Sequence, residues 1–314
     1  MSSIEKRSRN GKLSWRAHYR TPDGQQRNRS FPRKVDAERF LTTVESSKLA
    51  GSYIDPAMAR MTIEVWSQRW LDSQAHLKAS TRERYAGLLR EHVAPRWGRV
   101  KLSDVRHADV QAWVSDLAAN RSPSTAIKAH RVLSLVLSLA VRDGRLVRNP
   151  ADGMSLPREV QRDRRYLSHA EVHALADAAG PDRPIILVLA YTGLRFGELA
   201  ALRVRRVDLE KRRIEVAESV TSVNGVLTWG TPKGHARRWV SVPRFVAAEL
   251  TALIEGRGPD ELVFRSHNGG VLRSSNFRRD VFNPAAKPGC TTVSRLSAGR
   301  RAIMSLRGRR IELL

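Results

Sequence analysis

The sequence has a single cysteine and few aromatic side chains, and both shortages narrow the possible classes of protein. Cys290 has no partner cysteine in the chain, so we expect neither an internal disulfide nor a cysteine-based metal site. A reducing, cytoplasmic setting is therefore the default expectation. Aromatic residues make up only 6% of the 314 residues, but hydrophobic residues make up 41%, which suffices for packed cores in two or three domains.

Long apolar runs and acidic residues are scarce as well. No apolar run reaches the roughly 18 residues of a membrane span, so no membrane partner is expected. The first residues, MSSIEKRSRNGK, lack the apolar stretch of a secretory signal. The 31 acidic residues stand against 56 Lys and Arg, and the net charge is +25. Because this excess repels itself unless polyanions are near, nucleic acid is the first candidate partner. The alternative is the arginine-rich composition that a GC-rich genome produces.

Residues 1–55 have the pattern of a small sheet followed by a helix. The segments WRAHY and RNRSF alternate like strands, and VDAERFLTTVESSKLAG has one apolar face and ends at Gly51. A two-stranded basic ribbon can enter a major groove, whereas a solvated hairpin is the alternative. The arginines on these strands are the candidate DNA contacts: Arg16, Arg20, Arg27 and Arg29.

Residues 61–148 read as a helical domain that follows a linker at Asp55-Pro56. Ser80 and Glu83 have the spacing of a capping box at a helix start. The tryptophans of this region fall at core spacings. Basic residues on the polar faces predict a surface that lies on DNA, with solvated charges as the alternative: Lys78, Arg82, Lys128 and Arg131.

A second linker is expected at 149–160, and a mixed α/β pattern follows it. Ser168 and Glu171 form another capping box, and two apolar helical segments are broken at Gly193. Strands are expected at 212–219, 226–230 and 237–242. The dipeptide Asn224-Gly225 is a strong hairpin signal. A helix at 244–255, a short LVF segment and a helix around SNFRRDVF come next.

The stretch YTGLRFGEL (191–199) places Arg195 directly after a glycine turn. That position suits either a surface charge or a side chain aimed at a phosphate, which helix-start amides would also favour. Glu198 lies three residues on, on the same helical face, where it would orient Arg195. Farther along, Thr231-Pro232-Lys233-Gly234 lies between two predicted strands. In these two motifs and in its order of modules, the chain resembles a phage-type integrase of the tyrosine recombinase family.

The resemblance implies DNA strand exchange through a covalent phosphotyrosine. In that chemistry a tyrosine hydroxyl attacks a phosphodiester, and the covalent bond conserves the phosphoester, so no metal and no cofactor are expected. Charge builds on the non-bridging oxygens, which favours fixed guanidinium donors, and the resemblance gives this work to Arg195. Lys233, at a hairpin tip, would protonate the leaving 5′-oxygen as a general acid. His235 and Arg237 beside it are further candidate phosphate contacts.

The resemblance also implies the partners and the architecture. We expect a multidomain α+β chain with an arm-type DNA-binding module at 1–55, a helical core-binding domain at 61–148 and an incomplete catalytic domain at 161–287. Double-stranded DNA with attachment-type core and arm sites is the expected partner. A homo-oligomer on that DNA and a place at the nucleoid are further expectations.

The chain departs from the family pattern after Lys287. No tyrosine follows Tyr191, which we interpret as a core residue, and the only His-x-x-Arg string is His235 to Arg238, interpreted as a coincidence of a basic strand. The tail 288–314 has six arginines and one acidic residue, Glu312, and only weak helical spacing.

Two explanations for this tail compete: a frameshift in the gene, or a functional shortened integrase that binds DNA without cutting it. A serine nucleophile at Ser294 or Ser305 is disfavoured because no base lies nearby in the sequence. The chain is predicted to be inactive in cleavage. The alternative function is a non-catalytic DNA-binding protein that modulates recombination or transcription.

Overall fold

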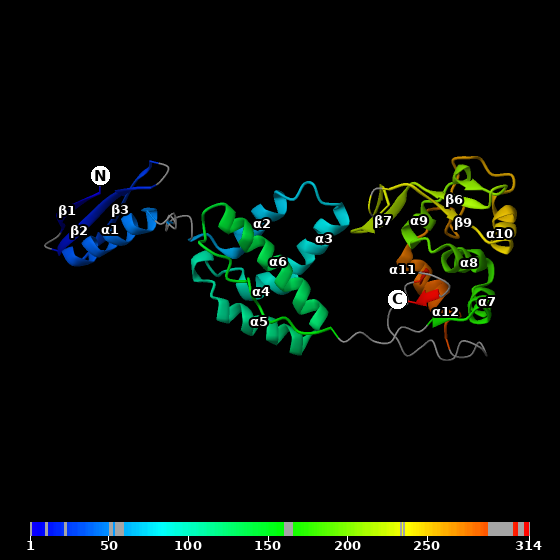
Figure 1. Ribbon diagram of the computed structural model, residues 1–314, viewed down its shortest axis with the longest axis horizontal. Helices are drawn as coiled ribbons and strands as arrows, with labels where there is room; N and C mark the ends of the chain where they lie inside the picture. Colours follow the sequence, from blue (N-terminus) through cyan, green and yellow to red (C-terminus); the bar gives the residue numbers. More distant parts are fainter. Residues whose placement is uncertain are drawn as a thin grey trace. The chain divides into compact units, whose positions relative to one another are not determined.

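The computed structural model describes residues 2–9, 12–21, 24–49, 53, 60–159, 166–232, 234, 236–287, 304–306 and 311–313, with only the backbone described in the last two ranges. The chain divides into two compact units, Met1–Val160 and Gln161–Leu314. The predicted fold class is confirmed, because a small sheet with a helix, a helical domain and an α/β domain follow one another along the chain (Figure 1).

The N-terminal module is a three-stranded antiparallel sheet with one helix on one of its faces (Figure 1). Its strands are β1 (Ser3–Arg9), β2 (Lys12–Arg20) and β3 (Gln26–Phe31), and its helix is α1 (Lys34–Leu49). Strands β2 and β3 and the helix were predicted, whereas β1 was not, because its many charged residues obscure the alternation. Ala17 and Tyr19 of β2 are buried, as are Ala37 and Val44 on the predicted apolar face of α1, and the ring of Tyr19 meets that of Phe40 in α1 edge to face.

The helical domain is built from five α-helices: α2 (Ile63–Asp72), α3 (Ala79–Leu88), α4 (Ala94–Trp97), α5 (His107–Asn120) and α6 (Pro123–Arg142). The expectation that tryptophans form its core is confirmed. Trp66 donates from its indole nitrogen to the carbonyl of Val136 at 2.9 Å, and the rings of Trp97 and Trp113 meet edge to face.

Helix α6 is long and apolar enough to span a membrane by length and composition alone. Its apolar residues instead line the core of the helical domain, where Val132, Leu133, Val136 and Leu137 are completely buried. A core helix surrounded by other helices has this composition because most of its surface faces apolar side chains.

Two sequence predictions for this domain are wrong. Helix α3 begins at Ala79 with Lys78 at its N-cap, so Ser80 lies inside the first turn and does not cap the helix. The segment that begins the predicted second linker is packed onto the helical domain. There the Asn149 amide donates to the Ser138 hydroxyl at 2.9 Å, and Ala151 is buried in the core.

The α/β domain surrounds α8, an apolar helix that is buried along most of its length. Its helices are α7 (His169–Ala178), α8 (Arg183–Thr192), α9 (Phe196–Ala200), α10 (Arg244–Ile254), α11 (Ser274–Phe277) and α12 (Asn283–Ala285). Its strands are β4 (Tyr166–Leu167), β5 (Val207–Asp208), β6 (Arg213–Val216), β7 (Ser219–Val223), β8 (Val226–Gly230), β9 (Arg238–Ser241), β10 (Met304–Leu306) and β11 (Ile311–Leu313).

The strand pairing differs from the expectation that residues 212–219 form a single strand. The predicted strand at 212–219 is two elements, because β6 pairs with β5 and β9 while β7 pairs with β8. The turn at Asn224-Gly225 is confirmed, since it joins β7 to β8 with both residues at positive φ. The tail, where weak helical spacing was noted, contributes two short strands, of which β11 pairs with β4.

Candidate functional site

A glycine turn sets the position of the candidate arginine. Helix α8 ends at Gly193, whose φ of 65° lies in the left-handed region that favours glycine. Leu194 then turns into the core, where it is 1% exposed, and Arg195 becomes the N-cap residue of α9. The sequence therefore buries the residue before Arg195 and leaves the arginine side chain itself 59% exposed.

Glu198 joins the backbone and the side chain of Arg195. Its Oε2 accepts the backbone N–H of Arg195 at 3.0 Å, and its Oε1 accepts a hydrogen bond from Nη1 of Arg195, also at 3.0 Å. The predicted orientation of Arg195 by Glu198 is therefore present. The same contacts occupy the Arg195 backbone N–H, so this amide is not available to the anion contact that the helix start suggested.

A second arginine, which sequence reasoning set aside, completes the arrangement. Arg238, the first residue of β9, donates from Nη1 to Oε1 of Glu198 at 3.0 Å and from Nη2 to Oε2 at 2.5 Å. Its side chain is 35% exposed, whereas that of Glu198 is 1% exposed. Arg238 lies on a strand, in keeping with the interpretation of its His-x-x-Arg string, but its contact with the Glu198 carboxylate was not predicted.

Both guanidiniums act on the protonation of the shared carboxylate. Burial alone would raise the pKa of Glu198, but hydrogen bonds from Arg238 and Arg195 outweigh it, so the pKa lies below its ordinary value. Glu198 is therefore an anion at neutral pH, and the three side chains together carry one net positive charge. We call Arg195, Glu198 and Arg238 the arginine–glutamate cluster.

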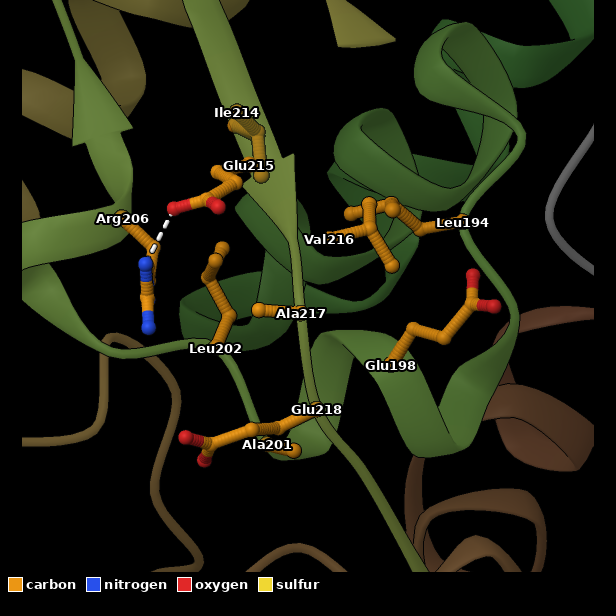
Figure 2. Close-up of a pocket in the computed structure, with 10 residues that line it drawn as sticks. All are labelled: Leu194, Glu198, Ala201, Leu202, Arg206, Ile214, Glu215, Val216, Ala217 and Glu218. Carbon is orange, nitrogen blue, oxygen red and sulfur yellow. Dashed lines mark hydrogen bonds and ion pairs between the residues drawn. The ribbon is translucent and has the colours of Figure 1, made fainter. Parts of the chain in front are cut away.

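Close packing holds the helix that carries this cluster. A Cβ on Gly197 would lie 2.6 Å from the backbone carbonyl oxygen of Val220 in β7, which is a clash. On another side of α9, a small cavity of about 10 Å³ separates it from β6. Figure 2 shows Glu198 pointing away from the Arg206–Glu215 ion pair on the far side of this cavity. The carboxylate is thus directed to the two arginines of its own cluster.

Lys233 and His235 lie outside the described residues. The strands on either side are described, and they show that the expected hairpin is wrong. Strand β8 pairs with β7 and β9 pairs with β6, so the segment between β8 and β9 connects two sheets. Arg237, the other candidate in this segment, has a side chain that is 72% exposed, with the Glu215 carboxylate 3.9 Å away. The role of Lys233 stays a prediction.

The four arginines of the N-terminal sheet do not share one face. In the register of β2 with β3, Ala17 lies opposite Arg29 and Tyr19 opposite Arg27, so both arginines point to the face that α1 covers. The guanidinium of Arg29 lies 5.2 Å from the ring centres of Phe31 and Phe40. Arg16 and Arg20 belong to the opposite face. A basic ribbon that contacts DNA through one face of this sheet could therefore use only two of the four arginines.

The four candidate basic residues of the helical domain lie on, or directly before, two helices that contact each other, α3 and α6. Arg82 pairs with Asp72 at 3.2 Å, and Lys128 donates to the hydroxyl of Ser124 at 2.7 Å. Lys78, Lys128 and Arg131 are exposed. Across the residues that the structure describes, no group of three or more His, Cys, Asp or Glu side chains forms a metal site.

Tyr191, interpreted as a core residue, has a more mixed environment. Its ring meets Phe245 edge to face, and it packs against the apolar core only in part. Its hydroxyl lies 2.9 Å from Nδ1 of His169. Burial raises the pKa of the Tyr191 hydroxyl, so the group is neutral at ordinary pH.

Sequence comparisons agree on one family for both large domains. The profile of the phage integrase central domain matches residues 63–155, and that of the phage integrase family matches residues 165–295. The integrase of Mycobacterium phage FRAT1 is 27% identical over 269 residues, which cover 83% of this chain and 78% of that protein.

Solved structures share the fold. The Tn1549 transposon integrase, in complex with a circular intermediate DNA, matches with a TM-score of 0.63 at 20% identity, over 72% of this chain and 78% of that one. A lambda integrase tetramer bound to a Holliday junction matches with a TM-score of 0.55 at 18% identity, over 89% and 83% of the two chains. This architecture is that of a tyrosine recombinase. The chain belongs to the phage integrase family.

Proposed function

We propose that the protein is a phage or prophage integrase of site-specific DNA recombination that binds duplex DNA at attachment-type sites, with Arg195 directed at a backbone phosphate. The observation that carries the proposal is that the exposed guanidinium of Arg195 is held by a hydrogen bond to the buried carboxylate of Glu198. A planar donor held in one orientation suits a phosphate, because two parallel hydrogen bonds form without further ordering. The net charge of +25 supplies the long-range attraction.

The division of labour follows the expected modules. Residues 1–55 bind an arm-type site, 61–148 bind the core site, and 161–287 form the incomplete catalytic domain in which Lys233 serves as the general acid. The chain assembles as a homo-oligomer on DNA and acts in the cytoplasm at the nucleoid. The relatives support this, since the Tn1549 and lambda integrases were solved on DNA and lambda integrase as a dimer and a tetramer.

A chain of these 314 residues is proposed not to cleave DNA. No tyrosine follows Tyr191, and no His-x-x-Arg string occurs after β9. The test uses a duplex that the full chain enriches from a random-sequence library, nicked beside the bound site so that a cut strand cannot be resealed. We expect no covalent protein–DNA adduct on a denaturing gel. An adduct would contradict the proposal, and mapping the attached peptide would identify the nucleophile.

Phosphate-dominated binding is tested by a salt series on the intact form of the same duplex. Affinity falls steeply with rising salt when many phosphates are neutralised. A flat salt dependence would contradict the proposal.

The frameshift explanation is tested by the nucleotide sequence past codon 287, where we expect another frame to encode His-x-x-Arg and then Tyr.

A non-catalytic DNA-binding protein is the second candidate function. The observation that favours it is the pairing of tail strand β11 with β4, which supports a folded, shortened product. Limited proteolysis distinguishes the two explanations. A chain damaged by a frameshift would lose residues from about 200 onward, because exposed apolar surface leaves the domain open to local unfolding, whereas a selected chain resists.

A further inference from the structure

We propose that Arg238 is a positioning residue: it holds the Glu198 carboxylate in the one orientation in which Glu198 in turn aims Arg195 at a DNA phosphate. The inference rests on the proposed phosphate contact of Arg195. Arg238 itself does not touch the DNA in this scheme. Its part is carried out entirely through the buried carboxylate that the two arginines share.

The geometry of its hydrogen bonds indicates that Arg238 positions Glu198 rather than contacts DNA. Arg238 approaches Glu198 with both terminal nitrogens, one to each carboxylate oxygen, which is the bidentate form that fixes a carboxylate plane. Arg195 gives a single side-chain nitrogen to the same carboxylate. Within the described residues, the more exposed Arg195 guanidinium therefore makes fewer side-chain hydrogen bonds than that of Arg238, which gives both terminal nitrogens to Glu198.

The chain arrangement makes Arg238 necessary. Glu198 lies on a helix of five residues, and its side chain is 1% exposed. A buried carboxylate with one partly exposed partner would be costly to keep ionised. Among the described residues, the other charged groups near the cavity beside α9 do not replace Arg238. Across the small cavity, Arg206 is paired with Glu215, and Glu218 is an acid paired with Arg203.

Removal of Arg238 is therefore expected to change both Glu198 and Arg195. Without the bidentate partner, burial dominates and Glu198 binds a proton more readily. A neutral carboxyl group accepts less strongly from Arg195, whose guanidinium then samples several orientations. Lysine at 238 would keep the positive charge but not the two-pronged contact, so it should restore the effect only in part.

The experiment is a double-mutant cycle on DNA affinity, made with the full chain and the duplex enriched from a random-sequence library. We expect Arg195→Ala and Arg238→Met each to weaken binding about tenfold, which corresponds to the loss of one charge-assisted hydrogen bond. In the Arg195→Ala background, Arg238→Met should weaken binding by less than about twofold, because there is no longer a guanidinium to aim.

The matched control is Arg237→Met, one residue away and pointing to solvent. Its effect on affinity should be the same with and without Arg195→Ala. An equal effect of Arg238→Met in the two backgrounds would show that Arg238 contacts DNA independently and would overturn the inference. No loss of affinity in Arg195→Ala alone would instead overturn the proposed phosphate contact, so the two failures are distinguishable.

A second readout excludes a merely structural effect. The Glu198 carboxyl carbon, followed by NMR in the full chain, reports its pKa directly. We expect a higher pKa in Arg238→Met than in the unsubstituted chain, and an intermediate value in Arg238→Lys. An unchanged Glu198 pKa in folded Arg238→Lys and Arg238→Met would overturn the positioning role whatever happens to DNA affinity. Should Arg238→Met fail to fold, Arg238→Lys alone decides through the same two measurements.

Discussion

The helical domain and the α/β domain treat positive charge in opposite ways. In the helical domain, Arg82 pairs with an exposed acid and Lys128 with a hydroxyl, and such exposed pairs contribute about 0–1 kcal/mol. In the α/β domain, two guanidiniums meet on a carboxylate that is 1% exposed. Under the proposed function, exposed cations of the helical domain supply attraction to DNA without a fixed geometry, whereas the arginine–glutamate cluster orients one cation, Arg195. Affinity and orientation are then proposed to depend on different parts of the chain.

The largest expected effect tests whether the helical domain depends on its core rather than its surface charge. Leu133 on α6 is completely buried. Leu133→Ala should lower the free energy of unfolding of this domain by about 2–5 kcal/mol, because it leaves a cavity. Urea denaturation followed by tryptophan fluorescence measures it. Lys128→Ala on the same helix is the control and should change stability by no more than about 0.5 kcal/mol.

A smaller effect is expected from the helix that carries the cluster. Gly197→Ala places a methyl group against the backbone carbonyl of Val220 and should destabilise the α/β domain by about 1–3 kcal/mol. Gly87, inside α3, has open space around it, so Gly87→Ala should stabilise its helix by about 0.5–1 kcal/mol. Thermal unfolding of both variants gives the comparison. Equal shifts of the same sign would contradict the close packing of α9 on β7.

The pH dependence of stability should distinguish the buried cluster from exposed pairs. The pKa of Glu198 is lowered in the folded chain, so its stabilising contribution is complete above its unfolded value, about 4.3, and is lost as pH falls through the lower folded value. The gap in melting temperature between Glu198→Gln and the unsubstituted chain should therefore narrow as the pH falls from the unfolded value through the folded value. A gap that stays constant with pH would show that folding does not lower the pKa of Glu198, and a gap that widens on acidification would show that folding raises it.

The smallest effect concerns the salt dependence of DNA binding. Lys128→Ala and Arg131→Ala should each reduce the slope of log affinity against log salt by about 1, since each removes one phosphate neutraliser. Arg195→Lys keeps the charge but loses the planar fork, so it should weaken binding while leaving the slope unchanged. If Arg195→Lys were silent and Lys128→Ala were not, the distinction between aim and attraction would fail.

Local patterns were predictable only where tertiary structure agreed with them. Ser168 and Glu171 form the expected reciprocal capping box, with both hydrogen bonds present. Ser80 and Glu83 have the same spacing, yet the helix there begins earlier, at Ala79. The capping pattern is satisfied by four residues alone, so it cannot tell how far the preceding turn extends the helix.

Strand pairing shows the same limit at longer range. The turn at Asn224-Gly225 is encoded by two adjacent residues that adopt positive φ, and it was predicted. The pairing of β6 with β9, which are separated in sequence by that entire hairpin, was not predicted. This pairing places Arg238 beside Glu198, forty positions away in sequence. No periodicity in either segment signals the contact. The only hint was a glutamate within an apolar helix, which requires a cation from somewhere.

The sequence by itself determined the strong positive charge, the apolar faces of the helices, the glycine turn before Arg195 and the i,i+3 spacing that brings Glu198 under it, because each depends on neighbouring residues. Tertiary structure alone decided that Arg238 shares that carboxylate, that Arg29 packs on aromatic rings while Arg16 lies on the opposite face, and that Asn149 is hydrogen-bonded to α6. The physical reason is that a buried charge must find its partner in space, and the chain folds distant segments together to supply it.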